Sequence, residues 1–187
     1  MNLLENPFHL LRALPTDDRK TLLERAEEMS LLGDADAPMD AVKQLINPKT
    51  RLKAEIAWLP GVDPDEYEEI TEELVKSEDA ANDSSNLPDL ARANLLATAL
   101  LEGGPEDEDD RPHWLCEIAS SLDDADPEDL LFEINSARSD AEIPLVASVS
   151  ELEAALFEHR SLLCSSLRSY LHSLPLEDRV EVLTKAI

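Results

Sequence analysis

The sequence predicts an all-α protein in which a compact N-terminal helical unit is followed by a helical bundle. Its 187 residues include only four glycines, two Trp, two Tyr and three Phe, which is few for a sheet protein with many turns. Apolar residues make up 43% of the chain and recur at spacings of three and four, as they do on the buried face of a helix. This composition predicts a folded chain of one domain or two small ones.

The first two helices are predicted from their apolar spacing and their boundary residues. Apolar positions over 3–14 predict a short amphipathic helix, which Pro15 is expected to end. A cap at Thr16 or Asp17 then begins a longer helix that runs through Leu32.

Residues 39–46 and 49–59 predict two more helices, because Asn47-Pro48 interrupts the pattern between them. The apolar stripe of the second helix is expected to pack against the third and fourth. The side chains of this predicted contact are Leu22, Leu23, Ala26 and Met29 on one side, and Leu45, Leu52 and Ile56 on the other.

The remaining residues predict six helices, at 63–76, 87–101, 112–122, 127–139, 150–174 and 176–187. The polar segment 77–86 predicts a loop. Residues 105–110 contain five carboxylates and no apolar side chain, so a disordered or mobile turn is expected there.

The distribution of charge predicts three parts. Residues 1–60 carry 8 basic and 10 acidic side chains, residues 61–110 carry 2 and 17, and residues 111–187 carry 6 and 15. We therefore expect a helical unit at 1–60, an acidic helical segment and linker at 61–110, and a C-terminal helical region at 111–187.

A net charge of -26 argues against any function that depends on a basic surface. Nucleic acid and membrane surfaces are both anionic, so neither is expected as a partner. The sequence contains no run of about 18 apolar residues, so no membrane span is expected. Its N-terminus lacks the basic segment of a signal peptide. The two cysteines match neither a disulfide framework nor a CxxC pair, and a cytoplasmic location is expected.

No residue pattern predicts catalysis, a cofactor or a metal site. His113 lies three residues before Cys116, and His159 lies five before Cys164, but neither spacing matches a zinc motif. Core cysteines are expected instead. The carboxylates are too numerous for any pair to stand out as a general acid and base, and no phosphate-binding loop or nucleophile motif occurs. The protein is not expected to be an enzyme.

Two segments carry a resemblance to a known family. Asn6-Pro7-Phe8-His9-Leu10-Leu11-Arg12-Ala13-Leu14, followed by Pro15-Thr16-Asp17-Asp18, resembles the opening of J domains, and Asn47-Pro48-Lys49-Thr50-Arg51-Leu52 is similar to the family's ending. The resemblance covers residues 1–60 and implies a J-like helical fold. It also raises the question of Hsp70 activation, which is the activity of that family.

The chain departs from the J-domain pattern where activity would reside. The resemblance implies a His-Pro-Asp tripeptide between the second and third helices, but this loop reads Gly33-Asp34-Ala35-Asp36-Ala37-Pro38. The family's second helix is basic, whereas residues 17–32 have a net charge of -2. A degenerate J-like unit that does not activate Hsp70 is therefore expected.

These observations predict a non-catalytic, chaperone-related helical module or adaptor that binds another protein, whose identity is unknown. An acidic inhibitor or nucleic-acid mimic that binds a basic target is an alternative, and so is a divergent co-chaperone with partial function in its loop. The weak candidates for protein contact are Asp34, Asp36 and Trp114. Trp114 fits either a core position or a surface anchor, while Trp58 is expected in the core.

Overall fold

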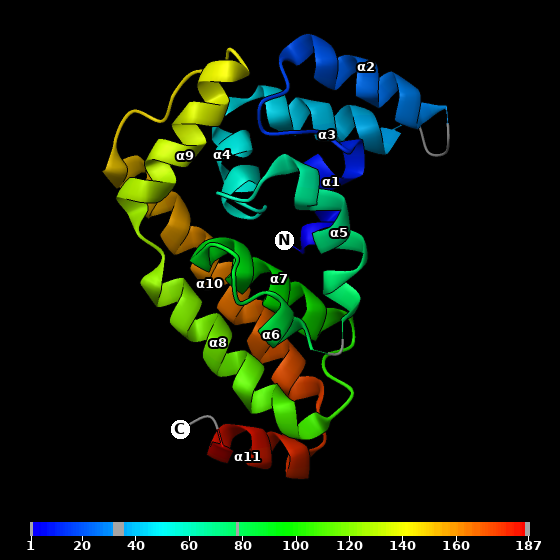
Figure 1. The fold of residues 1–187 in the computed structure, drawn as a ribbon, viewed down its shortest axis with the longest axis vertical. Helices are drawn as coiled ribbons and strands as arrows, with labels where there is room; N and C mark the ends of the chain where they lie inside the picture. Colours follow the sequence, from blue (N-terminus) through cyan, green and yellow to red (C-terminus); the bar gives the residue numbers. More distant parts are fainter. Residues whose placement is uncertain (1, 32–35, 78, 186–187) are drawn as a thin grey trace.

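The structure is a computed structural model that describes residues 2–31, 36–77 and 79–185, and helices are the only regular secondary structure in these ranges. The predicted all-α class is confirmed for this part of the chain. Figure 1 shows α1 to α5 gathered at one end of the molecule and α7, α8 and α10 running together toward the other, with α9 beside the N-terminal helices.

The N-terminal elements are η1 (Leu3–Glu5), α1 (Pro7–Leu11), α2 (Arg19–Ser30), α3 (Asp36–Ile46) and α4 (Pro48–Ile56). The first helix ends before Pro15, because Arg12 adopts a left-handed conformation with φ 50° and Ala13 N–H bonds back to the carbonyl of Phe8. Asp18, rather than Thr16 or Asp17, caps α2 by accepting a hydrogen bond from the backbone N–H of Thr21.

The middle of the chain forms η2 (Pro64–Glu66), α5 (Tyr67–Glu72), η3 (Leu74–Lys76), α6 (Ala80–Asp83) and α7 (Asp89–Glu102). The chain then continues through η4 (Glu108–Asp110), α8 (Arg111–Asp124), α9 (Pro127–Asp140), α10 (Val149–Ser173) and α11 (Leu176–Lys185). The single helix predicted at 63–76 is thus three short pieces, and the predicted loop at 77–86 contains one helical turn.

The segment 105–110, where a disordered or mobile turn is expected, contains η4 and makes polar contacts with its neighbours. Asp107 accepts a hydrogen bond from the backbone N–H of Asp109 at 3.0 Å. Lys185 Nζ lies 2.6 Å from Asp109 Oδ1, and Arg111 Nη2 lies 3.0 Å from Glu108 Oε1. Asp107 thus caps η4, and Glu108 and Asp109 are paired with basic side chains of α8 and α11.

The core consists of two clusters of buried side chains that share α4 and α7. The first cluster contains residues of α1, α2 and α3, together with Trp58, Val62 and Ile70. The second gathers α7, α8, α9 and α10. Buried positions run almost without a break from Leu90 to Leu100, so α7 is surrounded by protein and lies at the centre of the molecule.

The predicted packing of α2 is confirmed in part. Leu22, Ala26 and Leu45 are buried together in the first cluster, but Leu52 and Ile56 belong to the second. The reason is that α4 contacts α3 on one side and α10 on the other. Leu52 and Ile56 lie on the side that packs against α10. The first cluster also extends to Leu95, beyond the predicted boundary at residue 60.

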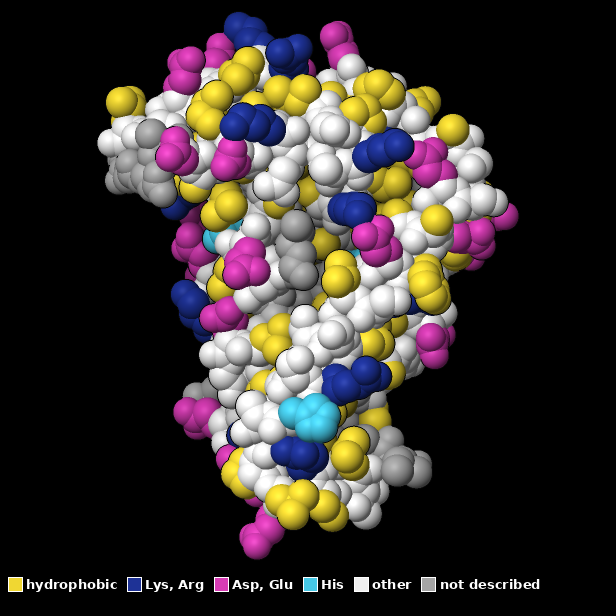
Figure 2. All heavy atoms as spheres, turned by 180° about the vertical axis from the view of Figure 1, so that it is seen from behind, with side chains coloured by type: hydrophobic (Ala, Val, Ile, Leu, Met, Phe, Trp, Pro, Cys, Tyr) yellow, Lys and Arg dark blue, Asp and Glu magenta, His cyan; other side chains and the backbone are white. Residues whose placement is uncertain are grey.

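The surface shows no dominant kind of side chain on the face opposite to that of Figure 1. Basic and acidic groups are interspersed there (Figure 2). At the end formed by α11, Leu176, Val180 and Leu183 are exposed. Among the described residues, no helix is both long enough and apolar enough to cross a membrane.

Candidate functional site

The exposed face of α9 combines a phenylalanine with carboxylates. Asp126 caps α9 by accepting from the backbone N–H of Glu128 at 2.7 Å. The buried stripe of the helix is Leu130, Ile134 and Arg138. Beside it runs an exposed stripe at spacings of three and four, made of Asp129, Phe132, Glu133, Ser136 and Asp140. Phe132 is 72% exposed.

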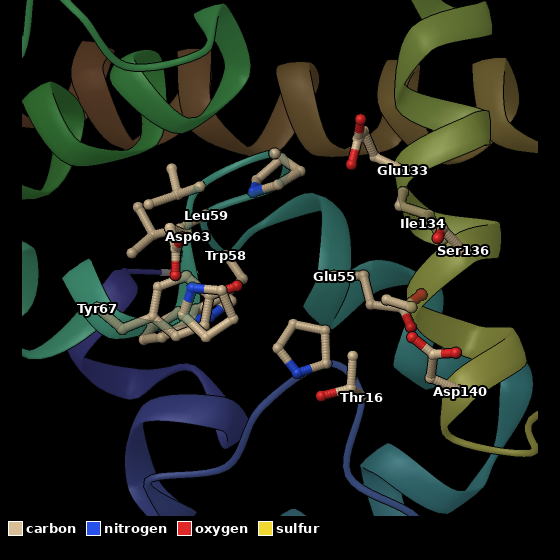
Figure 3. Close-up of a pocket in the computed structure, with 16 residues that line it drawn as sticks. Thr16, Glu55, Trp58, Leu59, Asp63, Tyr67, Glu133, Ile134, Ser136 and Asp140 are labelled. Atoms are coloured by element: carbon tan, nitrogen blue, oxygen red, sulfur yellow. The ribbon is translucent and has the colours of Figure 1, made fainter.

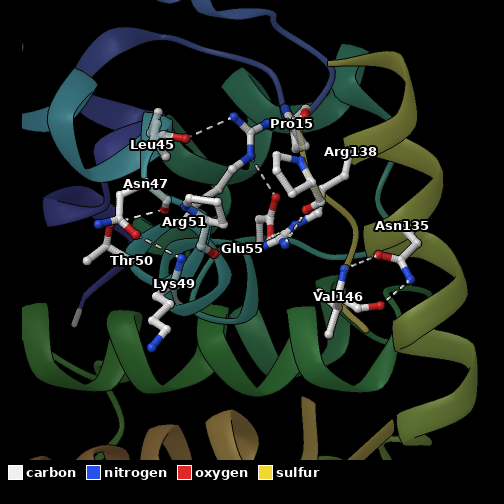
Figure 4. A network of polar contacts seen from close by, with 12 residues as sticks. Pro15, Leu45, Asn47, Lys49, Thr50, Arg51, Glu55, Asn135, Arg138 and Val146 are labelled. Carbon is white, nitrogen blue, oxygen red and sulfur yellow. Dashed lines mark hydrogen bonds and ion pairs between the residues drawn. The ribbon is translucent and has the colours of Figure 1, made fainter. Parts of the chain in front are cut away.

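A buried ionic network fixes α9 against α4 (Figure 4). Glu55 lies between two arginines and uses both carboxylate oxygens. Its Oε1 accepts from Arg51 Nε at 2.8 Å, and its Oε2 accepts from Arg138 Nε at 2.9 Å and lies 2.8 Å from Nη2 of the same arginine. The side chains of the three residues are no more than 4% exposed. Because water does not reach this site, the carboxylate of Glu55 and the two guanidinium groups stabilise one another's charges.

Backbone carbonyls complete this network. Arg138 donates to the carbonyl of Pro144 at 2.9 Å and to that of Pro48 at 3.0 Å. Arg51 donates to the carbonyls of Leu45 and Pro15. The guanidinium groups therefore join the end of α3, the start of α4 and the loop before α2 to α9, so the position of the exposed α9 face is set by buried contacts.

A cavity of about 370 Å³ lies between α9 and the segment 58–67. Figure 3 shows Glu133, Ser136 and Asp140 on its α9 side, and Leu59, Asp63 and Tyr67 across from them. We call it the α9 cavity. Its walls also include Pro15, Thr16, Glu55, Trp58, Pro60, Gly61, Val62, Pro64, Ile134 and Ala137. The cavity thus has an apolar wall and carboxylates from two separate elements.

Two further hollows lie against the same helix. One lies toward the start of α7 and is lined by Asp89, Asp124, Asp126, Asp129, Phe132 and Glu133, among others. The other is lined by Glu128, Leu131, Phe132, Asn135, Ser136, Ser139, Asp140 and Val149. Phe132 stands between these two hollows. We call the exposed α9 stripe and its three hollows the α9 surface.

The α9 surface is strongly acidic. Eight exposed carboxylates line its hollows, and no Lys, Arg or His does so: they are Asp63, Asp89, Asp124, Asp126, Glu128, Asp129, Glu133 and Asp140. None of the eight forms an ion pair with another residue in the described ranges. Because unpaired carboxylates close together repel one another, a cationic group placed among them would be attracted.

Two aromatic residues form the wall of the α9 cavity opposite α9. Tyr67 is half-buried, and burial, with a smaller contribution from the charge of Asp63, raises the pKa of its phenol, so it remains a neutral hydrogen-bonding group. Trp58 packs edge-on against Tyr67 with ring centroids 5.5 Å apart. It is 3% exposed, which confirms its predicted core position.

The site residues expected from the sequence do not form a common site in the described part of the chain. Asp34 lies outside the described residues, and Asp36 is the first residue of α3. Trp114 is only 2% exposed within the second cluster, so the surface-anchor alternative does not fit its position. Burial follows from its place on α8, where it shares a buried stripe with Ile118 and Leu122 on a helix that packs against α7.

The histidines and cysteines also lie apart. Both cysteines are exposed, so the expectation of core cysteines is wrong. His159 is buried and hydrogen-bonded to Asn94 Oδ1 at 2.8 Å, whereas His113 is exposed. In residues 2–31, 36–77 and 79–185, no three His, Cys, Asp or Glu side chains are grouped as metal ligands.

Sequence reasoning missed the α9 surface, although one signal was present. Phe132 falls outside the spacing of Leu130 and Ile134, so a helix that buries those two must expose the phenylalanine. The α9 cavity and the hollow toward α7 could not be predicted, because their walls come from segments far apart along the chain.

The chain matches no protein-family model, no curated protein and no solved structure.

Proposed function

We propose that this chain is a non-catalytic protein-interaction module that contacts its partner through the α9 surface. The observation that supports this proposal is the position of Phe132, which is 72% exposed and lines two hollows of the α9 surface. Covering a phenylalanine that water surrounds contributes about 1.5–3 kcal/mol to association. Aromatic side chains are enriched among the residues that dominate protein interfaces. The adjacent hollows give such a partner room to place its own side chains.

A photocrosslinking experiment tests this function. We expect p-benzoylphenylalanine at position 132 to cross-link a defined protein in extracts of the source cell. The matched control places the same residue at Phe157 of α10, which is 74% exposed but lines none of the three hollows. Phe132→Ser should abolish capture of this partner by affinity purification, whereas Phe157→Ser should retain it. Equal loss in both variants, or the same products from both positions, would contradict the proposal.

We also propose that the J-like unit does not activate Hsp70. The sequence of residues 33–38 lacks the His-Pro-Asp tripeptide, and Glu24, Glu27 and Glu28 lie among the basic residues of α2. In a single-turnover assay, the protein is expected to leave Hsp70 ATP hydrolysis within about twofold of its basal rate. An authentic J protein serves as the positive control. Stimulation comparable to that control, lost on Asp36→Ala, would instead support a divergent co-chaperone.

An acidic inhibitor or nucleic-acid mimic is a second candidate, favoured by the eight unpaired carboxylates of the α9 surface. The two functions differ in the partner. For a mimic, the partner's contact surface would be a basic groove that also binds DNA or RNA, and nucleic acid would compete with this chain. An adaptor's partner would bind through a segment that is not part of a nucleic-acid-binding groove.

A further inference from the structure

The α9 cavity combines two kinds of contact, apolar and anionic. Trp58, Leu59 and Tyr67 belong to its apolar wall, and Asp63, Glu133 and Asp140 bring carboxylates to it. Figure 3 shows these carboxylates on opposite sides. Glu55 also lines the cavity, but its two oxygens are already bound by Arg51 and Arg138. The carboxylates available to a ligand are therefore those of the two opposing walls.

The spacing of these carboxylates does not suit a single metal ion. Glu133 and Asp140 are seven residues apart on one helix, which places them about 10 Å apart along its axis. One cation cannot be ligated by both, because metal–oxygen bonds are roughly 2–2.6 Å long. Ser136 and Ala137 lie between them on the cavity wall. An elongated ligand that carries positive charge fits this arrangement better than a compact ion.

A second copy of this chain would also be a poor occupant. The carboxylates of its own α9 surface would face those of the first, and each chain has a net charge of -26. Like charges brought together in an interface cost free energy. The complementary partner is a different protein with a basic segment.

We propose that the α9 cavity accepts an arginine side chain from a basic, partly apolar segment of the partner, with an apolar residue of the same segment covering Phe132. This inference rests on the function proposed above and specifies the chemistry of the partner. The guanidinium group is planar, so it packs against aromatic rings and donates paired hydrogen bonds to a carboxylate. Lysine has a compact, strongly hydrated charge and offers neither geometry.

Peptide binding to the intact protein tests this inference. The probe is a fluorescein-labelled synthetic peptide that contains arginine and leucine, and two further versions replace arginine by lysine or by glutamate. Fluorescence anisotropy is measured at low and high salt. We expect the arginine peptide to bind at least about threefold more tightly than the lysine peptide. The glutamate peptide should not bind, and binding should weaken as salt increases.

Variants locate the binding to the cavity. Glu133→Gln with Asp140→Asn is expected to weaken binding of the arginine peptide by about tenfold or more. The control, Glu153→Gln with Glu177→Gln, makes the same change in net charge at exposed positions outside the cavity, and should change binding by less than about twofold. Circular dichroism checks that both variants are folded, and both are expected to give the wild-type spectrum.

The outcomes separate this inference from the function on which it rests. Equal weakening by both pairs of substitutions would overturn the cavity assignment, and equal affinity for arginine and lysine would overturn the choice of arginine. If position 132 cross-links a partner while the arginine peptide does not bind, the proposed interaction function is supported and the proposed basic segment of the partner is contradicted. If neither occurs, both proposals fail.

Discussion

Replacing Glu55 by glutamine is expected to lower the free energy of unfolding by about 3–5 kcal/mol. Arg51 and Arg138 are buried, with side chains 0% and 2% exposed, and Glu55 is the carboxylate that both of them bind. A neutral amide leaves two guanidinium groups in the interior without a counter-charge. It also presents an N–H group where one arginine needs an acceptor, so a buried hydrogen bond is lost as well. Urea denaturation followed by circular dichroism measures the change.

Glu158→Gln is the matched control for this prediction. Glu158 also joins two distant helices, because its carboxylate lies 2.7 Å from Nζ of Lys53, but both side chains are about half exposed. Exposed ion pairs contribute roughly 0–1 kcal/mol, so this variant should unfold close to the wild type. A loss at Glu55 no larger than the loss at Glu158 would contradict the structural role assigned to the network.

Acidification from pH 7 to pH 4 is expected to cost about 2–3 kcal/mol of stability through His159 alone. Burial, with a smaller contribution from the charge of Arg160, lowers the pKa of His159 from 6.5 to about 4. Asn94 Nδ2 donates to the carbonyls of Ile56 and Trp58 at 2.8 Å each, so its Oδ1 accepts a hydrogen bond from Nε2 of the neutral imidazole.

The direction of this pH dependence follows from the protonation of His159 in the folded and in the unfolded chain. Above pH 6.5, His159 is neutral in both the folded and the unfolded chain and contributes no pH dependence. Between pH 6.5 and about 4, the unfolded chain takes up a proton that the folded chain does not, so stability falls as the pH is lowered. Below pH 4 both states are protonated and this contribution no longer changes.

Difference curves isolate this effect from the many carboxylates. The stability of the wild type minus that of His159→Gln is expected to decrease by about 2–3 kcal/mol between pH 7 and pH 4, because the variant has no imidazole to protonate. The matched control is His113→Gln, the same substitution at an exposed position of α8. A flat difference curve for His159→Gln would mean that the imidazole of His159 is solvated in the folded protein.

The sequence alone determined where most helices lie, because helix formation depends on local signals. Asn6-Pro7, Asn47-Pro48 and Asp126-Pro127 each place a capping side chain before a proline, and all three begin helices. Apolar spacing also placed α7 and α10 within about two residues of their observed bounds. These features depend on neighbours within one or two turns, which can be read directly from the chain.

The tertiary structure alone decided which polar side chains are buried together and which face becomes a surface. Glu55 and Arg138 are 83 residues apart, and Asn94 and His159 are 65 apart, so no local pattern relates them. In the sequence these four residues do not differ from the many other charged and polar residues. Folding buries them and brings each to its hydrogen-bonding partner. The α9 cavity has the same origin, since its walls come from the loop before α2, the segment after α4 and one side of α9. Long-range packing sets burial, and burial gives a carboxylate, a histidine or a phenylalanine its particular role in this protein.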